Sequence, residues 1–172
     1  MTDEGMSKKE WLCNIILTVL GIACFPINPL VLSGLVDPGF IREAYMIGWF
    51  VWGIGMVLVM APIVMFPRRG GVDKGSSFVH TTKLVDTGIY GVVRHPQYLG
   101  GILSLFLTST LWYPHWMIII MGIAGSVAIY MGTIEEDRRL VDKFGPEYER
   151  YMERVPRMNL LAGIARKLGR GG

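Results

Sequence analysis

The stretch LGGILSLFLTSTLWYPHWMIIIMGIAGSVAIYMGTI, residues 99–134, contains no lysine, arginine, aspartate or glutamate. Two similar uncharged stretches precede it, at 11–36 and 44–66. A hydrocarbon core about 30 Å thick requires about 18 or more apolar residues of a helix that crosses it. The chain of 172 residues is 51% hydrophobic and only 18% charged, whereas soluble domains carry about a quarter charged residues. These features exclude most soluble folds and predict an all-α, polytopic integral membrane protein.

Four spans fit this pattern, at about 11–35, 44–66, 97–113 and 116–134. The first is too long for the core of a signal peptide, so we expect it to be retained. The third and fourth are separated only by Tyr113-Pro114-His115, which predicts a tight antiparallel hairpin. We treat residues 1–172 as a single membrane domain.

The basic residues predict the orientation of these spans. Sixteen of the 17 lysines and arginines fall on one side, and only Arg42 lies in the loops of the opposite side. By the positive-inside rule, the basic side is cytoplasmic. We therefore expect a multi-pass protein with both termini in the cytoplasm. The positions of these charges favour membrane topology over nucleic acid as the reason for the net charge of +3.

Two cytosolic segments, about 67–97 and 135–157, interrupt the apolar pattern of the spans and contain the candidate sites. In the second, Gly145 is expected to end a helix and Pro146 to begin the next one. The apolar residues on one face of this segment are expected to face the membrane or the core. They are Leu140, Val141, Phe144, Tyr148, Tyr151 and Met152.

The first candidate site surrounds Pro96, which is expected to begin the third span. The free N–H groups of that helix would then lie beside Arg94 and His95, and such a helix end can bind a carboxylate or phosphate. Four glycines are expected to let the backbone approach a ligand or a neighbouring helix closely, namely Gly88, Gly91, Gly100 and Gly101. The alternative is that Arg94 and His95 are ordinary interfacial anchors.

The second candidate is Glu135-Glu136, where the two side chains point about 100° apart on a helix. Glu135 can pair with Arg138 or Arg139 at helical spacing. Glu136 is then expected to turn inward and accept hydrogen bonds from a diol such as a ribose. The alternative is a solvated charge cluster just outside the bilayer. No set of histidines, cysteines and carboxylates has the spacing of metal ligands, so we expect no metal site.

The motifs Leu84-Val85-Asp86-Thr87-Gly88-Ile89-Tyr90 and Arg94-His95-Pro96-Gln97-Tyr98-Leu99-Gly100 resemble a known signature. It is that of the isoprenylcysteine carboxyl methyltransferase and phospholipid methyltransferase superfamily. Glu135-Glu136, Phe144-Gly145-Pro146-Glu147-Tyr148 and Arg154-Val155-Pro156 match its second half in order. The resemblance covers about residues 80–157, and the first two spans match only by hydropathy.

The resemblance implies a methyl transfer from S-adenosylmethionine, bound between the cytosolic ends of the last spans and the C-terminal helices. The acceptor would be a small or lipid-like amphiphile, and membrane lipids would surround the protein. The catalytic residues remain open, with Arg94, Glu135 and Arg139 as candidates. The cofactor residues that the resemblance implies are Leu84, Val85, Tyr90, His95, Pro96, Gln97, Tyr98 and Glu136.

The chain departs from the prenylcysteine enzymes where the methyl acceptor is thought to bind. It has Gly132 in place of an arginine four residues before the cofactor glutamate, and Thr82 in place of a histidine. A prenylcysteine carboxylate is therefore not the expected substrate, and an amine or thiol is preferred. Two alternatives stay open: an NADPH-dependent membrane reductase that shares the C-terminal scaffold, and a non-catalytic membrane protein.

Overall fold

The structure is a computed structural model that describes Gly34, residues 41–69 and residues 83–169. The predicted first span at 11–35 lies outside the described residues except for Gly34. Residues 70–82 of the predicted cytosolic loop, including Thr82, also lie outside them.

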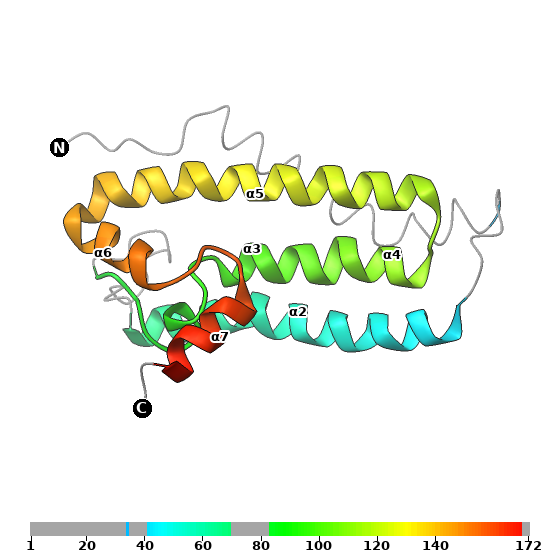
Figure 1. Cartoon of the computed structure of the whole chain (residues 1–172), viewed down its shortest axis with the longest axis horizontal. Coiled ribbons are helices and arrows are strands. Elements are labelled where there is room, and N and C mark those ends of the chain that lie inside the picture. Colours follow the sequence, from blue (N-terminus) through cyan, green and yellow to red (C-terminus); the bar gives the residue numbers. More distant parts are fainter. Residues whose placement is uncertain (1–33, 35–40, 70–82, 170–172) are drawn as a thin grey trace.

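All regular elements of the described residues are helical, which agrees with the all-α prediction. Their bounds are α2 (Arg42–Arg69), the 3₁₀ turn η2 (Gly88–Gly91), α3 (Pro96–Gly101), the π-helical η3 (Ile102–Leu107), α4 (Thr108–Trp112), α5 (Trp116–Phe144), α6 (Pro146–Arg154) and α7 (Leu160–Gly169). Figure 1 shows α2, the α3–α4 rod and α5 lying side by side along the long axis, with α6 and α7 at one end.

Two of these helices are long and apolar enough to cross a membrane, namely α2 over Arg42–Ala61 and α5. They correspond to the predicted spans at 44–66 and 116–134. The predicted span at 97–113 coincides with the rod formed by α3, η3 and α4. Because the first predicted span is not described, the count of four spans remains a prediction.

The π-helical turn η3 has a local cause in two hydroxyl side chains. The Ser104 hydroxyl donates to the backbone oxygen of Gly100 at 2.7 Å, and the Thr108 hydroxyl donates to that of Leu103 at 2.8 Å. Hydroxyls that bond to nearby carbonyls compete with the regular hydrogen bonds of a helix. They also satisfy polar atoms in an apolar rod, where both side chains are buried.

Close packing between α2 and α3 depends on one pair of glycines. A methyl group on Gly100 would lie 2.6 Å from the backbone oxygen of Gly55, and one on Gly55 would lie 2.8 Å from the backbone nitrogen of Ser104. The expected close approach is therefore confirmed at Gly100. At Gly101 an added methyl group would meet nothing within 4 Å among the described residues, so this glycine makes no such approach to α2.

Helix α5 continues ten residues past the predicted end of its span, as far as Phe144. Gly145 ends it with a φ of 57°, a left-handed conformation that favours glycine, and Pro146 begins α6. This break was predicted, and it turns α6 back so that its tyrosines meet the end of α5. Tyr148, Tyr151 and Val155 form the centre of a cluster to which the predicted residues Leu140, Val141, Phe144 and Met152 add their side chains, together with Leu84.

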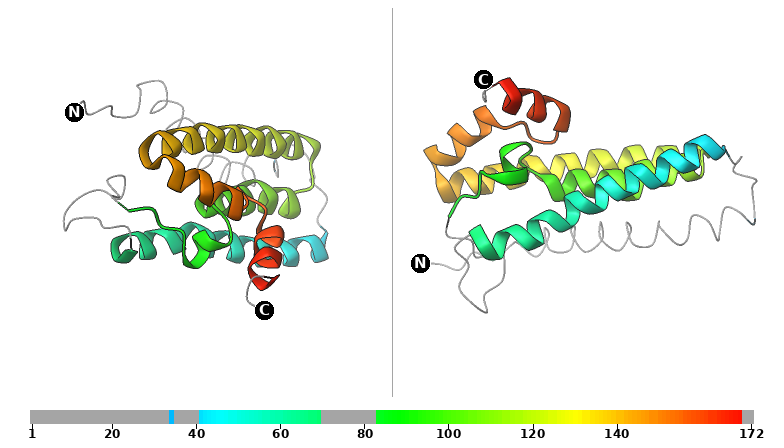
Figure 2. Two further views of the ribbon diagram at one scale, coloured as in Figure 1. Left: turned by 60° about the vertical axis from the view of Figure 1, so that its left-hand side comes forward. Right: turned by 90° about the horizontal axis from the view of Figure 1, so that it is seen from below.

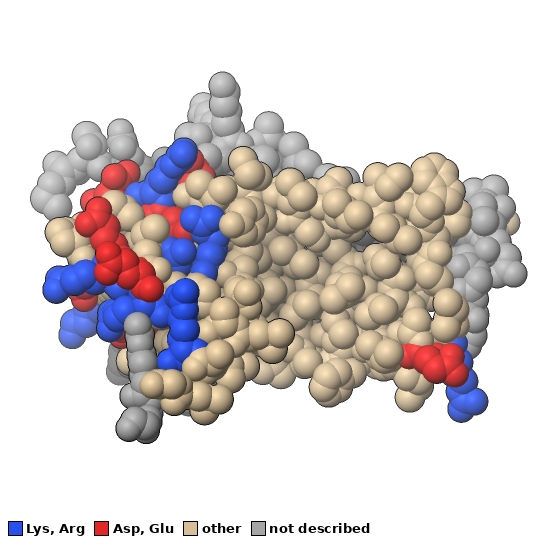
Figure 3. All heavy atoms as spheres, in the orientation of Figure 1, with Lys and Arg blue, Asp and Glu red and all other residues tan. Residues whose placement is uncertain are grey.

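The surface of the bundle agrees with a position in a membrane. Large apolar side chains are exposed along both long helices, for example Phe50 and Val57 on α2 and Ile123 and Met131 on α5. Figure 3 shows uncharged surface over most of the length, with charged side chains gathered at the end where α6 and α7 lie. A smaller charged group lies at the opposite end, where α2 begins with Arg42 and Glu43.

Candidate functional site

The site is assembled where the segment before α3 meets the segment after α6. Pro96 is the first residue of α3, as predicted, and His95 precedes it as the N-cap residue. The backbone N–H of Arg94 donates to the oxygen of Pro156 at 3.0 Å, and that of His95 donates to the oxygen of Arg157 at 3.1 Å. These two bonds tie the motif around Pro96 to a stretch 62 residues further along the chain.

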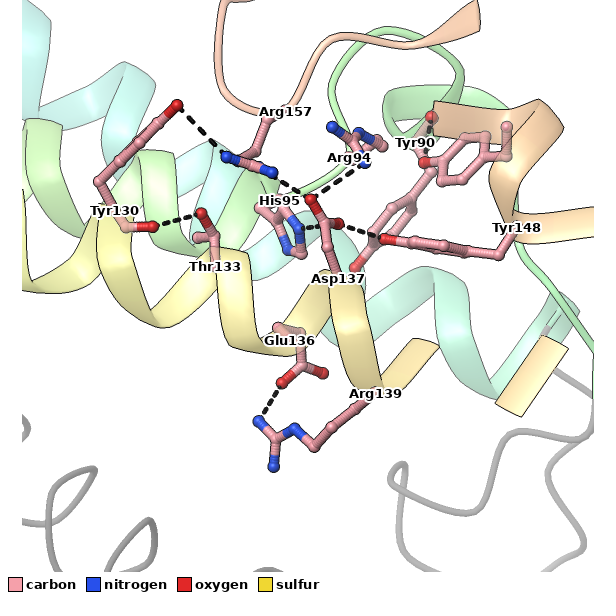
Figure 4. A network of polar contacts seen from close by, with 11 residues as sticks. Tyr90, Arg94, His95, Tyr130, Thr133, Glu136, Asp137, Arg139, Tyr148 and Arg157 are labelled. Atoms are coloured by element: carbon pink, nitrogen blue, oxygen red, sulfur yellow. Dashed lines mark hydrogen bonds and ion pairs between the residues drawn. The ribbon is translucent and has the colours of Figure 1, made fainter. Parts of the chain in front are cut away.

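Asp137 is the centre of a buried polar network at this junction (Figure 4). Its side chain is 3% exposed. Oδ1 accepts hydrogen bonds from His95 Nε2 at 2.8 Å and from the Tyr148 hydroxyl at 2.6 Å. Oδ2 accepts one from Arg157 Nε at 2.8 Å and lies 3.0 Å from Arg94 Nη1. One carboxylate therefore joins four segments, and two guanidinium groups balance its charge.

Arg94 is buried in this network with part of its hydrogen-bonding capacity unfilled. Its side chain is 7% exposed, and its Nε has no hydrogen-bond partner among the described residues. Nη1 is at ion-pair distance from Asp137, but not in the geometry of a hydrogen bond. A buried guanidinium with an unfilled N–H can donate a hydrogen bond to an anionic or carbonyl oxygen of a ligand.

The tyrosines beside the network are neutral side chains in a packed environment. Burial raises the pKa of Tyr148, and the hydrogen bond it donates to Asp137 raises that pKa further. Burial likewise raises the pKa of Tyr90 and of Tyr151. The Tyr151 hydroxyl donates to the backbone oxygen of Tyr90 at 2.7 Å, which fixes η2 against α6.

Glu136 and Arg139 lie on another side of α5, away from the Asp137 network (Figure 4). Glu136 is 31% exposed and pairs with Arg139 at 2.6 Å. Tyr98, near the start of α3, interacts electrostatically with both of them. Its ring also contacts that of His95, with 5.7 Å between the ring centres. Tyr98, Glu136 and Arg139, all predicted site residues, thus lie within electrostatic range of one another on two helices, and Tyr98 is the one beside His95. We call these three residues the Glu136 flank.

The inward-facing carboxylate is Asp137, whereas we expected Glu136 to turn inward. Glu135 pairs with Arg138 at 3.1 Å as expected, but Glu136 has a partner of its own in Arg139. Asp137 stands three, four and seven residues before Leu140, Val141 and Phe144, so it heads the apolar face of α5. That spacing is the signal by which the sequence could have identified it.

The other predicted cofactor residues divide between the core and the surface. Val85, Tyr90, His95 and Pro96 are buried, and Leu84 packs against the α6 cluster, whereas Gln97 is exposed. Asp137 is bound directly by Tyr148, which the sequence analysis placed on an apolar face, and by Arg157, which it did not single out. Among the described residues, no group of three or more histidines, cysteines or carboxylates is arranged to hold a metal ion.

The fold and site define a helical membrane protein whose polar site lies at one end of its apolar bundle. The chain belongs to the phospholipid methyltransferase family, whose pattern matches residues 44–147. That match covers α2 through the start of α6, including every residue of the Glu136 flank. It ends before Tyr148, so α7 lies beyond it.

Several known methyltransferases are similar to this chain. A methanethiol S-methyltransferase of Pseudomonas deceptionensis is 27% identical over 112 residues, which cover 62% of this chain and 41% of that protein. Methanethiol S-methyltransferase 1 of Bradyrhizobium diazoefficiens is 34% identical over 67 residues, which cover 39% of this chain and 22% of that protein. Protein-S-isoprenylcysteine O-methyltransferase B of Arabidopsis thaliana is 27% identical over 121 residues, which cover 63% of this chain and 58% of that protein.

The matched regions thus span less than two thirds of these relatives' lengths. No solved structure matches the chain. The relatives and the family support a membrane-associated methyltransferase, and they lend no support to the reductase alternative.

Proposed function

We propose that this chain transfers a methyl group from S-adenosylmethionine to a small thiol or lipid-like neutral acceptor at the membrane–cytosol boundary. The observation that carries the proposal is the partly exposed ion pair of Glu136 and Arg139 at 2.6 Å, within electrostatic range of Tyr98 in α3. This group lies in the part of the chain that matches the methyltransferase family.

The residues present have the chemistry that the methyl donor requires. Glu136 is partly exposed and can accept hydrogen bonds from a ribose diol. Arg94 has an unfilled donor for a carboxylate oxygen. S-adenosylmethionine, when bound, supplies a methyl group on a sulfonium. The protein then has to hold the acceptor in line with that group and exclude water, which needs no metal.

The acceptor is proposed from the charges around Gly132. This residue stands one helical turn before Glu136, and an added methyl group there would meet nothing within 4 Å. Three arginines could replace the missing cation, but each is already paired: Arg138 with Glu135, Arg139 with Glu136 and Arg154 with Asp86. A carboxylate acceptor would be desolvated here without an offsetting cation, which is costly.

A thiol avoids this penalty because it arrives neutral. Its sulfur forms the new bond to the methyl carbon as the bond from that carbon to the sulfonium sulfur breaks. The thiol proton leaves to solvent, and S-adenosylhomocysteine is the second product. The similarity to methanethiol S-methyltransferases supports this choice.

The experiment compares acceptors with the purified full chain in lipid nanodiscs and a methyl-labelled donor. Methanethiol, a long-chain alkanethiol, an amine lipid and acetyl-farnesylcysteine are supplied at one donor concentration, with and without EDTA. We expect the thiols to be methylated fastest and EDTA to have no effect. A clearly faster rate with the prenylcysteine would overturn the argument from Gly132. Oxidation of NADPH coupled to turnover would favour the reductase instead.

A further inference from the structure

Helix α7 has an apolar face that no part of the described chain covers. Leu161 is 79% exposed, Leu168 is 74% exposed and Ile164 is 42% exposed. They stand three and seven residues apart, so they lie on one face of the helix. Three exposed aliphatic side chains on a ten-residue helix are costly in water, at about 25 cal/mol per Å² of apolar surface.

The opposite face of α7 is fixed to the site. Gly163 is buried, and a methyl group there would overlap the backbone oxygen of Val92. Val92 is two residues before Arg94, the buried arginine of the Asp137 network. The side chain of Asn159 accepts from the backbone N–H of Ala162 at 3.0 Å and caps the start of the helix. Packing against the protein therefore directs the apolar face outward.

The charge of α7 is of one sign. Its ten residues include Arg166 and Lys167 in the last turn and contain no acidic residue. Both basic side chains are exposed. A basic helix with an exposed apolar face is typical of segments that lie in the surface of an anionic membrane.

The position of α7 agrees with such a surface. The views in Figures 1 and 2 show α7 oblique to the long helices, at the end that carries α6. Figure 3 shows charged side chains gathered at that end, next to the uncharged surface of the bundle. A helix at this boundary lies at the membrane surface when the bundle crosses the membrane.

We propose that α7 is a membrane-surface helix of the cytosolic leaflet. Leu161, Ile164 and Leu168 insert among the acyl chains, and Arg166 and Lys167 bind anionic lipid headgroups. Because Gly163 packs on Val92, insertion also holds the segment that leads to Arg94 at the membrane boundary. The inference depends on the proposed orientation of the bundle and not on the identity of the methyl acceptor.

The test measures the depth of a nitroxide label in the full chain, reconstituted in nanodiscs. Single cysteines replace Leu161 or Leu168 in a Cys13→Ser, Cys24→Ser background. Phe50→Cys on α2 serves as the bilayer reference and Glu153→Cys on α6 as the aqueous reference, since both side chains are exposed. Collisions with oxygen report hydrocarbon, and collisions with a neutral nickel chelate report water.

In discs that contain anionic lipid, we expect the labels at 161 and 168 to collide with oxygen more than with the nickel chelate, as the label at 50 does. Attraction to anionic lipid shifts the equilibrium between inserted and free α7 toward the inserted state by about fivefold for each basic residue. The double variant R166Q/K167Q, or purely zwitterionic discs, should therefore shift the labels toward water. The double variant K143Q/R150Q removes the same charge elsewhere on the exposed surface and should not.

Each contrary result overturns the inference in a distinguishable way. If the label at 50 lies in hydrocarbon while those at 161 and 168 are in water, α7 does not insert and the bundle orientation stands. If 161 and 168 are shielded from both reagents, another protein surface covers α7. If the label at 50 is itself in water, the proposed orientation fails as well.

Discussion

Asp137 stabilises the junction that positions the site. It is the only buried carboxylate among the described residues, and it is bonded to His95, Tyr148 and Arg157 and paired with Arg94. Removing one member of a buried ion pair leaves an uncompensated charge, which costs about 3–5 kcal/mol. We predict that Asp137→Asn lowers the thermal unfolding temperature of the purified protein strongly.

The matched control for this change is Asp142→Asn, because Asp142 is exposed on the same helix. It should leave the unfolding temperature nearly unchanged. Similar melting curves for the two variants would show that the network contributes little to stability.

Glu136 and Glu135 provide a second pair of neighbouring residues with different expected roles. We predict that Glu136→Gln weakens binding of S-adenosylhomocysteine, because a hydrogen bond to a charged group contributes about 1.5–3 kcal/mol. Glu135→Gln should bind it normally, since Glu135 is half exposed and paired with Arg138 in an ion pair on the surface. Titration calorimetry on both variants measures the difference, and a larger loss at Glu135 would contradict the assignment.

At the scale of elements, the contact between α2 and α3 is the most sensitive to added volume. Gly100→Ala places a methyl group against the backbone of α2, and overpacking of this kind costs about 1–3 kcal/mol. Gly101→Ala adds the same group where nothing lies within 4 Å, and alanine is favoured over glycine in a helix by up to about 1 kcal/mol. We predict a lower unfolding temperature for the first variant and an equal or higher one for the second.

Both glycine variants should be measured in the same detergent and by the same thermal melt. If Gly100→Ala melts no lower than Gly101→Ala, the two helices separate easily and the glycine contact does not define their packing.

At the scale of the whole molecule, the two charged ends predict its orientation in the membrane. Figure 3 shows the larger charged group at the end with α6 and α7 and the smaller at the start of α2. We predict that, in intact cells, a membrane-impermeant thiol reagent labels Glu43→Cys and not Glu153→Cys. Both variants carry the Cys13→Ser and Cys24→Ser changes, and permeabilised cells should label both. The reverse pattern would place the site on the outer side.

The sequence by itself determined the helical class, the positions of the long apolar helices and the break at Gly145 and Pro146. These features depend on local properties: uninterrupted apolar length, a residue that accepts a left-handed backbone and a residue that lacks an N–H. The motif around Pro96 and the acidic pair at 135–136 could also be proposed as candidate site segments, because their residues are close together in the chain.

Only the tertiary structure decided which carboxylate turns inward. Three acidic residues stand in a row at 135–137, and their type does not distinguish them. The choice depends on where α6 and the 156–157 segment fold back, because these bring Tyr148 and Arg157 to Asp137. Likewise, Gly100 and Gly101 are alike in sequence, and only the approach of α2 makes one of them necessary. Contacts between residues distant in the chain set both outcomes, so local pattern could not predict them.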